Sequence, residues 1–135
     1  MAFMAWDEQY AVGIAEIDRQ HQGLVRMIND LHAALVAERG QLALAEIVGR
    51  MLDYAAVHFA TEETLLKQHR YPQYDAHRGE HEGFRVKARE LKQRVDNKRF
   101  VLTLEVINFL KDWLSDHILV SDREYAPFLI GAGVR

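Results

Sequence analysis

The 135-residue sequence contains no cysteine and only two prolines, and none of its apolar runs is both long and uncharged. Without cysteine the chain forms no disulfide and offers no thiolate to a metal ion. Glu105, Lys111 and Asp112 interrupt the apolar stretch after Phe100, which falls short of the roughly 18 apolar residues that cross a bilayer. We therefore expect a protein that does not span a membrane.

The chain also lacks a strong charge of either sign. Its formal net charge is −3, which gives no electrostatic basis for binding nucleic acid. Met1 to Tyr10 contain no Lys or Arg, unlike a secretory signal. With 49% hydrophobic and 27% charged residues, the sequence is typical of a single soluble domain over residues 1–135. We expect this domain to be cytoplasmic.

Long intervals free of proline carry apolar residues at helical spacing. Pro72 and Pro127 are the two prolines, and alternating β-branched residues are scarce. The apolar stripes predict helices at about 17–39, 41–69, 73–96 and 100–120. Short connections favour antiparallel neighbours, so the expected fold is an all-α, up-down-up-down four-helix bundle. Residues 1–16 are expected as an ordered N-terminal arm and residues 121–135 as a C-terminal tail.

Histidines interrupt these apolar stripes repeatedly. Five of the seven histidines lie at stripe positions, together with one glutamate: His21, His58, Glu62, His77, His81 and His117. A single histidine in a core is more often a hydrogen-bonded structural residue. Five imidazoles converging in an apolar interior lack the donors and acceptors to satisfy one another. A metal ion would resolve that deficit.

The bundle topology places these residues at one end. His21 lies near the start of the first helix, the pair His58/Glu62 near the end of the second, and the pair His77/His81 near the start of the third. Each pair is spaced i, i+4, so both members can point at one centre. All four predicted helices therefore deliver candidate ligands to the same end.

Five imidazoles exceed what one tetrahedral zinc uses, which favours two metal ions and a second carboxylate. Asp122 is the best candidate, five residues beyond His117. That spacing is about 140° around an ideal helix, so the helix must widen or end there. Asp112 and Asp116 are competitors, but both point away from the stripe, as ordinary surface residues do.

The order His21, His58-x-x-x-Glu62, His77-x-x-x-His81, His117-x-x-x-x-Asp122 resembles the hemerythrin family, specifically the single-domain bacteriohemerythrins. The flanking segments 17–21, 58–63 and 113–118 are similar to that family too. The resemblance implies two iron ions, cycling between Fe²⁺ and Fe³⁺ and bridged by an oxo or hydroxo oxygen. It assigns one iron to His77, His81 and His117 and the other to His21 and His58, with Glu62 and Asp122 bridging both.

Such a ligand set leaves one of the roughly twelve positions of two octahedra open, on the iron with two histidines. In the family this position binds O2 reversibly, so the function expected is oxygen carriage, storage or delivery rather than catalysis. Six apolar side chains near the ligands would wall off the open position, although ordinary core packing explains them equally well: Leu24, Phe59, Phe84, Trp113, Leu114 and Ile118.

Other functions stay open. The same centre could serve a di-iron enzyme acting on peroxide or nitric oxide, with a proton source that the predicted stripes do not supply, or an O2-sensing or iron-storage module. The partners expected are O2 and an O2-consuming recipient protein, and the chain is expected to be monomeric. Features given no ligand role comprise His32 and His69, the basic segment 85–99, Gly79 and Gly83, and Tyr125, which could shield the site or pack in the tail.

Overall fold

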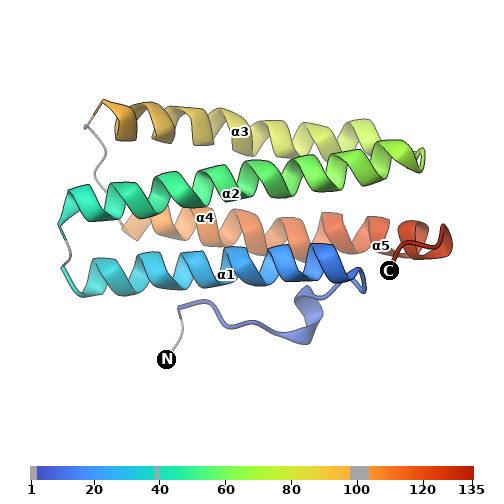
Figure 1. The fold of residues 1–135 in the computed structure, drawn as a ribbon, viewed down its shortest axis with the longest axis horizontal. Helices are drawn as coiled ribbons and strands as arrows, with labels where there is room; N and C mark the ends of the chain where they lie inside the picture. Colours follow the sequence, from blue (N-terminus) through green and yellow to red (C-terminus); the bar gives the residue numbers. More distant parts are fainter. Residues whose placement is uncertain (1–2, 39, 98–103) are drawn as a thin grey trace.

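The computed structural model describes residues 3–38, 40–97 and 104–135, and within these ranges it contains helices and no strand. Four long helices run in alternating directions (Figure 1). They are α1 (Ala15–Val36), α2 (Gln41–Gln68), α3 (Tyr74–Asp96) and α4 (Leu104–Asp116), followed by a π-helix, η2 (His117–Asp122), and by α5 (Arg123–Gly131). The fold is therefore the predicted all-α, up-down-up-down bundle. None of the helices in the described ranges is long and apolar enough to cross a membrane.

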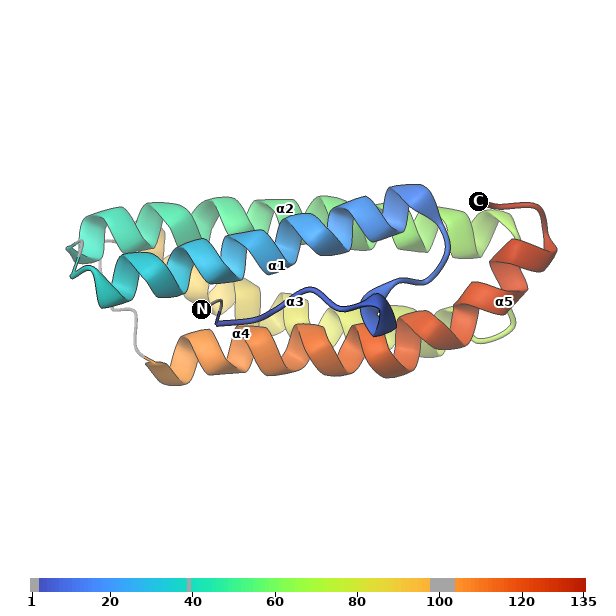
Figure 2. The ribbon, with the colours of Figure 1, turned by 90° about the horizontal axis from the view of Figure 1, so that it is seen from below.

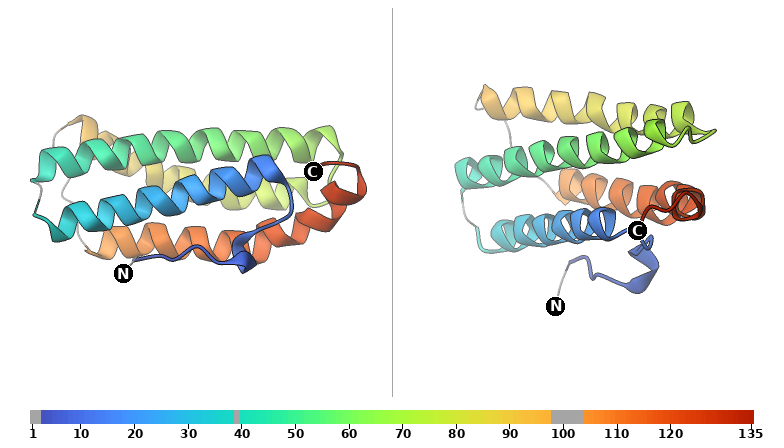
Figure 3. Two further views of the ribbon diagram at one scale, coloured as in Figure 1. Left: turned by 60° about the horizontal axis from the view of Figure 1, so that its bottom comes forward. Right: turned by 45° about the vertical axis from the view of Figure 1, so that its right-hand side comes forward.

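The helices α2 and α3 lie close to the predicted ranges, whereas α1 runs from Ala15 to Val36 instead of 17–39 and the C-terminus differs more strongly. Arg39 and residues 98–103, where the first predicted helix ends and the fourth begins, lie outside the described residues. The expectation of a tail over residues 121–135 is wrong, because the chain stays helical to Gly131. Figures 2 and 3 show α5 turning away from the line of α4 across the end of the bundle. Tyr125, Ala126 and Leu129 of α5 are buried there.

The N-terminal segment lies along α1 and α4 (Figure 2). The backbone of Met4 exchanges two hydrogen bonds of 2.7 Å with the side-chain amide of Asn29. A short 3₁₀ helix, η1 (Glu8–Tyr10), follows, and the Tyr10 hydroxyl lies 3.2 Å from Oγ of Ser115. The segment is thus tied to two helices, and it ends where α1 begins at Ala15, two residues earlier than expected.

A tight turn fixes the start of α1. Oδ1 of Asp18 accepts a 2.7 Å hydrogen bond from the backbone N–H of Val12, and Oδ2 accepts one of 3.2 Å from Gly13. Gly13 has a φ of +85°, which favours glycine. These hydrogen bonds fix the path by which the N-terminal segment enters α1, the helix that carries His21.

The apolar interior consists of two clusters separated by polar side chains. Leu24 of α1, Phe59 of α2 and Ile118 of η2 belong to the larger cluster. About two helical turns away towards the end of the bundle, Ile17, Leu66 and Tyr125 belong to the smaller one. His21, Glu62 and Asp122 lie between these residues along the three elements and are buried. The polar layer therefore crosses the whole bundle.

Candidate metal centre

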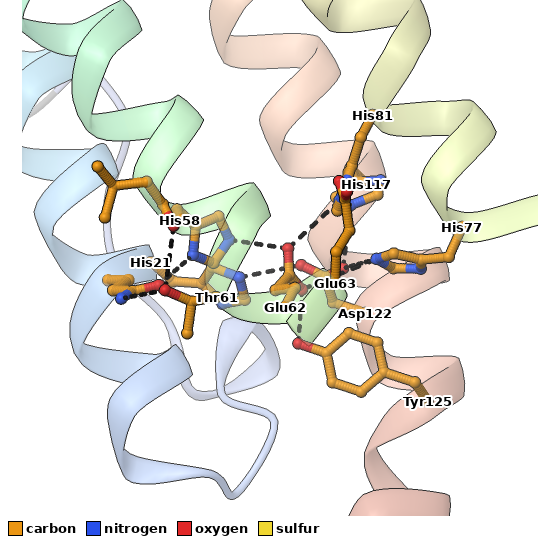
Figure 4. A network of polar contacts seen from close by, with 12 residues as sticks. His21, His58, Thr61, Glu62, Glu63, His77, His81, His117, Asp122 and Tyr125 are labelled. Carbon is orange, nitrogen blue, oxygen red and sulfur yellow. Dashed lines mark hydrogen bonds and ion pairs between the residues drawn. The ribbon is translucent and has the colours of Figure 1, made fainter. Parts of the chain in front are cut away.

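Seven polar side chains meet in this layer (Figure 4). Each is at most 4% exposed. They come from α1, α2, α3 and η2, and they are the seven ligands predicted from the sequence: His21, His58, Glu62, His77, His81, His117 and Asp122. The structure thus brings every predicted metal-ligating residue to one place.

The local helix geometry explains how residues five apart share a face. The π-helix η2 covers His117–Asp122 and is wider than an α-helix. As a result Nε2 of His117 lies 3.0 Å from Oδ1 of Asp122. Asp112 and Asp116, the alternative carboxylates, are exposed. Widening of the helix, one of the two possibilities expected from the spacing, is what occurs.

The donor atoms form two groups that share both carboxylates. One group contains three imidazoles, from His77, His81 and His117; the other contains two, from His21 and His58. Within each group the donor atoms lie within 4.8 Å of one another, and each group includes an oxygen of Glu62 and of Asp122. We call these the three-histidine group and the two-histidine group.

Asp122 divides its oxygens between the two groups. Oδ1 lies 3.2 Å from Nε2 of His77, in the three-histidine group. Oδ2 lies 2.9 Å from Nε2 of His21, in the two-histidine group. A carboxylate in this position has the geometry of a bridge between two ions.

Glu62 also contacts both groups. Its Oε1 lies 3.0 Å from Nε2 of His58 and 3.4 Å from Nε2 of His81. Its Oε2 lies 3.8 Å from Nε2 of His77 and accepts a 2.6 Å hydrogen bond from the Tyr125 hydroxyl. Both carboxylates therefore stand between the same two sets of imidazoles.

These buried nitrogen and oxygen atoms suit metal ions better than they suit hydrogen bonding with one another. Several buried atoms lack a well-aligned hydrogen bond, including Nε2 of His21, His58 and His77, Oε1 of Glu62 and both oxygens of Asp122. Orphaned polar atoms of this kind are costly in an interior. Nε2 of His81 and Nε2 of His117 face each other at 3.0 Å. Imidazole nitrogen and carboxylate oxygen are ordinary ligands of divalent transition metals, iron among them.

Two outer contacts orient the imidazoles. Nδ1 of His58 lies 2.7 Å from Oε1 of Gln20, and Nδ1 of His81 lies 2.7 Å from Oε2 of Glu63. When Nδ1–H donates to such a partner, Nε2 is left free for a metal. The sequence analysis did not assign roles to Gln20 and Glu63, although each is adjacent to a predicted ligand.

Electrostatics in the metal-free centre follow from this crowding. Burial and Glu62 raise the pKa of Asp122, but the close contacts with His117 and His21 outweigh them and hold it at about 2. Burial lowers the pKa of His77, whereas the close contacts with Asp122 and Glu62 raise it to about 10. Burial likewise opposes ionisation of Glu62, yet His58 keeps its pKa well below the usual value. Without metal, a proton held on His77 compensates part of the carboxylate charge.

Aromatic rings cover the inner side of the centre. Phe59 stacks on His81 with ring centroids 4.1 Å apart, and Trp113 stacks on His117 at 4.6 Å. Phe84 contacts both Phe59 and Trp113. The other predicted pocket residues are buried in the same apolar cluster: Leu24, Leu114 and Ile118.

The features without a ligand role lie elsewhere. His32 stacks on Phe3 at 4.2 Å, and His69 caps the end of α2. The described cations of the basic segment 85–99 pair with nearby carboxylates, for example Lys92 with Asp53 at 3.0 Å. Lys98 and Arg99 lie outside the described residues. These pairs favour a solvated face over a docking patch.

Comparison with known proteins agrees with this geometry. The chain is 36% identical over 125 residues to a bacteriohemerythrin of Pseudomonas aeruginosa (strain UCBPP-PA14), covering 93% of this chain and 80% of the relative. It is 28% identical to a bacteriohemerythrin of Methylococcus capsulatus, covering 96% and 98%. A crystal structure of wild-type hemerythrin superposes with a TM-score of 0.87 at 27% identity, covering 95% of this chain and 98% of that one. The family model described as hemerythrin HHE cation binding domain matches residues 12–129, and the chain therefore belongs to the hemerythrin family.

Proposed function

We propose that the protein binds O2 reversibly at a pair of iron ions and serves oxygen carriage, storage or delivery. The observation that carries this proposal is the unequal division of five imidazoles around two shared carboxylates. His77, His81 and His117 would hold one iron, His21 and His58 the other, and Glu62 and Asp122 would bridge them. When bound, the iron pair supplies redox-active metal with one position open to a small ligand.

The chain itself directs the ligand to one side. An ion in the two-histidine group receives one imidazole fewer, so the open position falls beside His21 and His58. These side chains are 0% and 1% exposed. Exclusion of water protects a bound small molecule from side reactions.

Neutral imidazoles also suit reversible binding. They donate less charge to iron than carboxylates do, which favours the ferrous state over irreversible oxidation. Related four-helix di-iron enzymes hold their metals with more carboxylates. The buried hydroxyl of Tyr125 already donates a hydrogen bond to Glu62. Tyr125 is therefore not a free acid that would protonate a bound ligand.

The test is anaerobic loading of the protein with Fe²⁺, followed by alternating O2 and argon while metal content and the visible spectrum are recorded. We expect two irons per chain and a colour that appears and disappears over many cycles. Consumption of O2 without recovery of the colour would support an enzyme, and iron uptake without any O2-dependent colour would support storage.

A matched pair of histidine variants sharpens this test. His58→Ala removes an imidazole of the two-histidine group and should abolish the reversible colour. His32→Ala alters a histidine outside both groups and should leave iron content and colour unchanged. Equal effects of the two substitutions would contradict the proposed ligand set.

A further inference from the structure

One imidazole in each group contacts, through its Nδ1 atom, a side chain outside the group, and these two side chains differ in charge. In the two-histidine group, His58 contacts a neutral amide, Oε1 of Gln20, at 2.7 Å. In the three-histidine group, His81 contacts a carboxylate, Oε2 of Glu63, at the same distance. A carboxylate that accepts an imidazole N–H makes the opposite ring nitrogen more basic, and it does so more strongly than an amide.

Arg85 counteracts part of this charge. Its Nη2 lies 2.6 Å from the same Oε2 of Glu63 that faces His81. Glu63 and Arg85 are 14% and 24% exposed, so solvent screens the pair incompletely. The guanidinium also lies 5.7 Å from the ring centre of Phe59, the residue that stacks on His81. Arg85 thus lies beside both the carboxylate of Glu63 and the ring of Phe59.

We propose that Glu63 and Arg85 are a positioning pair that sets the reduction potential of the iron in the three-histidine group. Glu63 increases the electron density that His81 donates and so stabilises Fe³⁺, while Arg85 limits this effect and preserves Fe²⁺. The step concerned is the uptake of one electron by Fe³⁺ to give Fe²⁺. The inference rests on the proposed di-iron centre and adds a means of distinguishing its two irons.

Two substitutions should shift the potential in opposite directions. Glu63→Gln keeps a carbonyl oxygen that can accept from Nδ1–H of His81 but removes the negative charge, and we expect a higher potential. Arg85→Met removes the positive charge, and we expect a lower one. Arg85→Lys retains the charge and should restore most of the wild-type value.

The measurement is a reductive titration of protein containing two irons per chain, with a chemical reductant and mediators. Arg94→Met is the matched control, because Arg94 lies on the same helix but pairs with Glu90 in solvent. It should leave the potential unchanged. Folding of every variant is checked by circular dichroism.

A second measurement does not depend on iron. In Zn²⁺-loaded protein, proton NMR detects the Nδ1–H of His81, whose resonance should move upfield in Glu63→Gln because its acceptor is neutral. This readout also decides the matter for a variant that fails to retain both irons. The ring proton of His58, which faces Gln20, serves as the internal reference.

Equal potentials in all variants that hold two irons would overturn the inference, as would shifts of the same sign for Glu63→Gln and Arg85→Met or an unmoved His81 resonance. Failure of the proposed function looks different. In that case the wild-type protein itself would lack two irons or the reversible colour, whatever the variants do.

Discussion

The buried hydroxyl of Tyr125 donates a 2.6 Å hydrogen bond to Oε2 of Glu62. The tyrosine is fully buried, and it comes from α5, a helix that the sequence analysis did not expect. The C-terminal helix therefore takes part in positioning a carboxylate that stands between the two groups of imidazoles.

Removing this hydroxyl should destabilise the metal-free protein. Tyr125→Phe leaves a buried carboxylate oxygen without its donor, which costs about 1–3 kcal/mol. Urea denaturation measures the change. Tyr10→Phe is the control, because the Tyr10 hydroxyl makes a 3.2 Å contact in a partly exposed place, and its loss should cost about 1 kcal/mol or less. A smaller effect at Tyr125 than at Tyr10 would contradict this view of the Glu62 hydrogen bond.

Loss of a shared carboxylate should reduce the metal content. Because Glu62 contacts both groups, Glu62→Ala is expected to lower the iron content below two per chain. Metal analysis after anaerobic loading checks this. Glu46→Ala changes an exposed glutamate of the same helix and should retain the full content. A Glu62→Ala protein with both irons would exclude Glu62 as a bridge.

The stability of the metal-free protein should depend on pH in two windows. The pKa of Asp122 is lowered from 3.8 to about 2, so its stabilising contribution is complete above pH 3.8 and is lost as the pH falls towards 2. The pKa of His77 is raised from 6.5 to about 10, so its contribution is complete below pH 6.5 and is lost as the pH rises towards 10. Denaturation midpoints should therefore be highest between these windows, and midpoints that rise steadily from pH 6.5 to 9 would contradict the expectation for His77.

Glycines of α1 and α3 should respond to alanine with opposite signs. A Cβ at Gly23 would overlap the hydroxyl of Tyr54 on α2, and such overpacking costs about 1–3 kcal/mol. Better helix propensity offsets at most about 1 kcal/mol, so Gly23→Ala should destabilise the protein. Gly79 has no atom within 4 Å of a Cβ position, and Gly79→Ala should stabilise by up to about 1 kcal/mol. Thermal melting of the metal-free variants distinguishes the two, and a gain in stability at Gly23 would contradict the close packing of α1 on α2.

The spacing of polar residues along apolar stripes was enough to predict which side chains lie together. Six of the seven predicted ligands interrupt a pattern that their neighbours define. The seventh, Asp122, lies five residues after His117, a step that required the helix to widen or end, and η2 widens. Periodicity carries this information because a helix repeats its geometry along its whole length.

Contacts between elements are what the sequence could not supply. The predicted helices ended at about residue 120, yet Pro127 costs α5 only one backbone hydrogen bond, worth about 3 kcal/mol with its steric effect. Burial of Tyr125 and Leu129 outweighs that loss at roughly 1.5–3 kcal/mol for each large side chain. Gln20 and Glu63 were given no role for a related reason. Polar residues are common on helix surfaces, and their partners are set by the packing of one helix on another.

Metal ions bound in the polar layer between the two apolar clusters would stabilise the fold as well as bind a ligand. The smaller cluster, which joins the start of α1, the end of α2 and α5, meets the rest of the interior across charged and imidazole groups. Ions at the centre would fasten both halves into one cooperative unit. Without metal ions, the end of the bundle that contains the smaller cluster should open independently. Backbone amides there should exchange with deuterium long before those around Ile28 and Leu110.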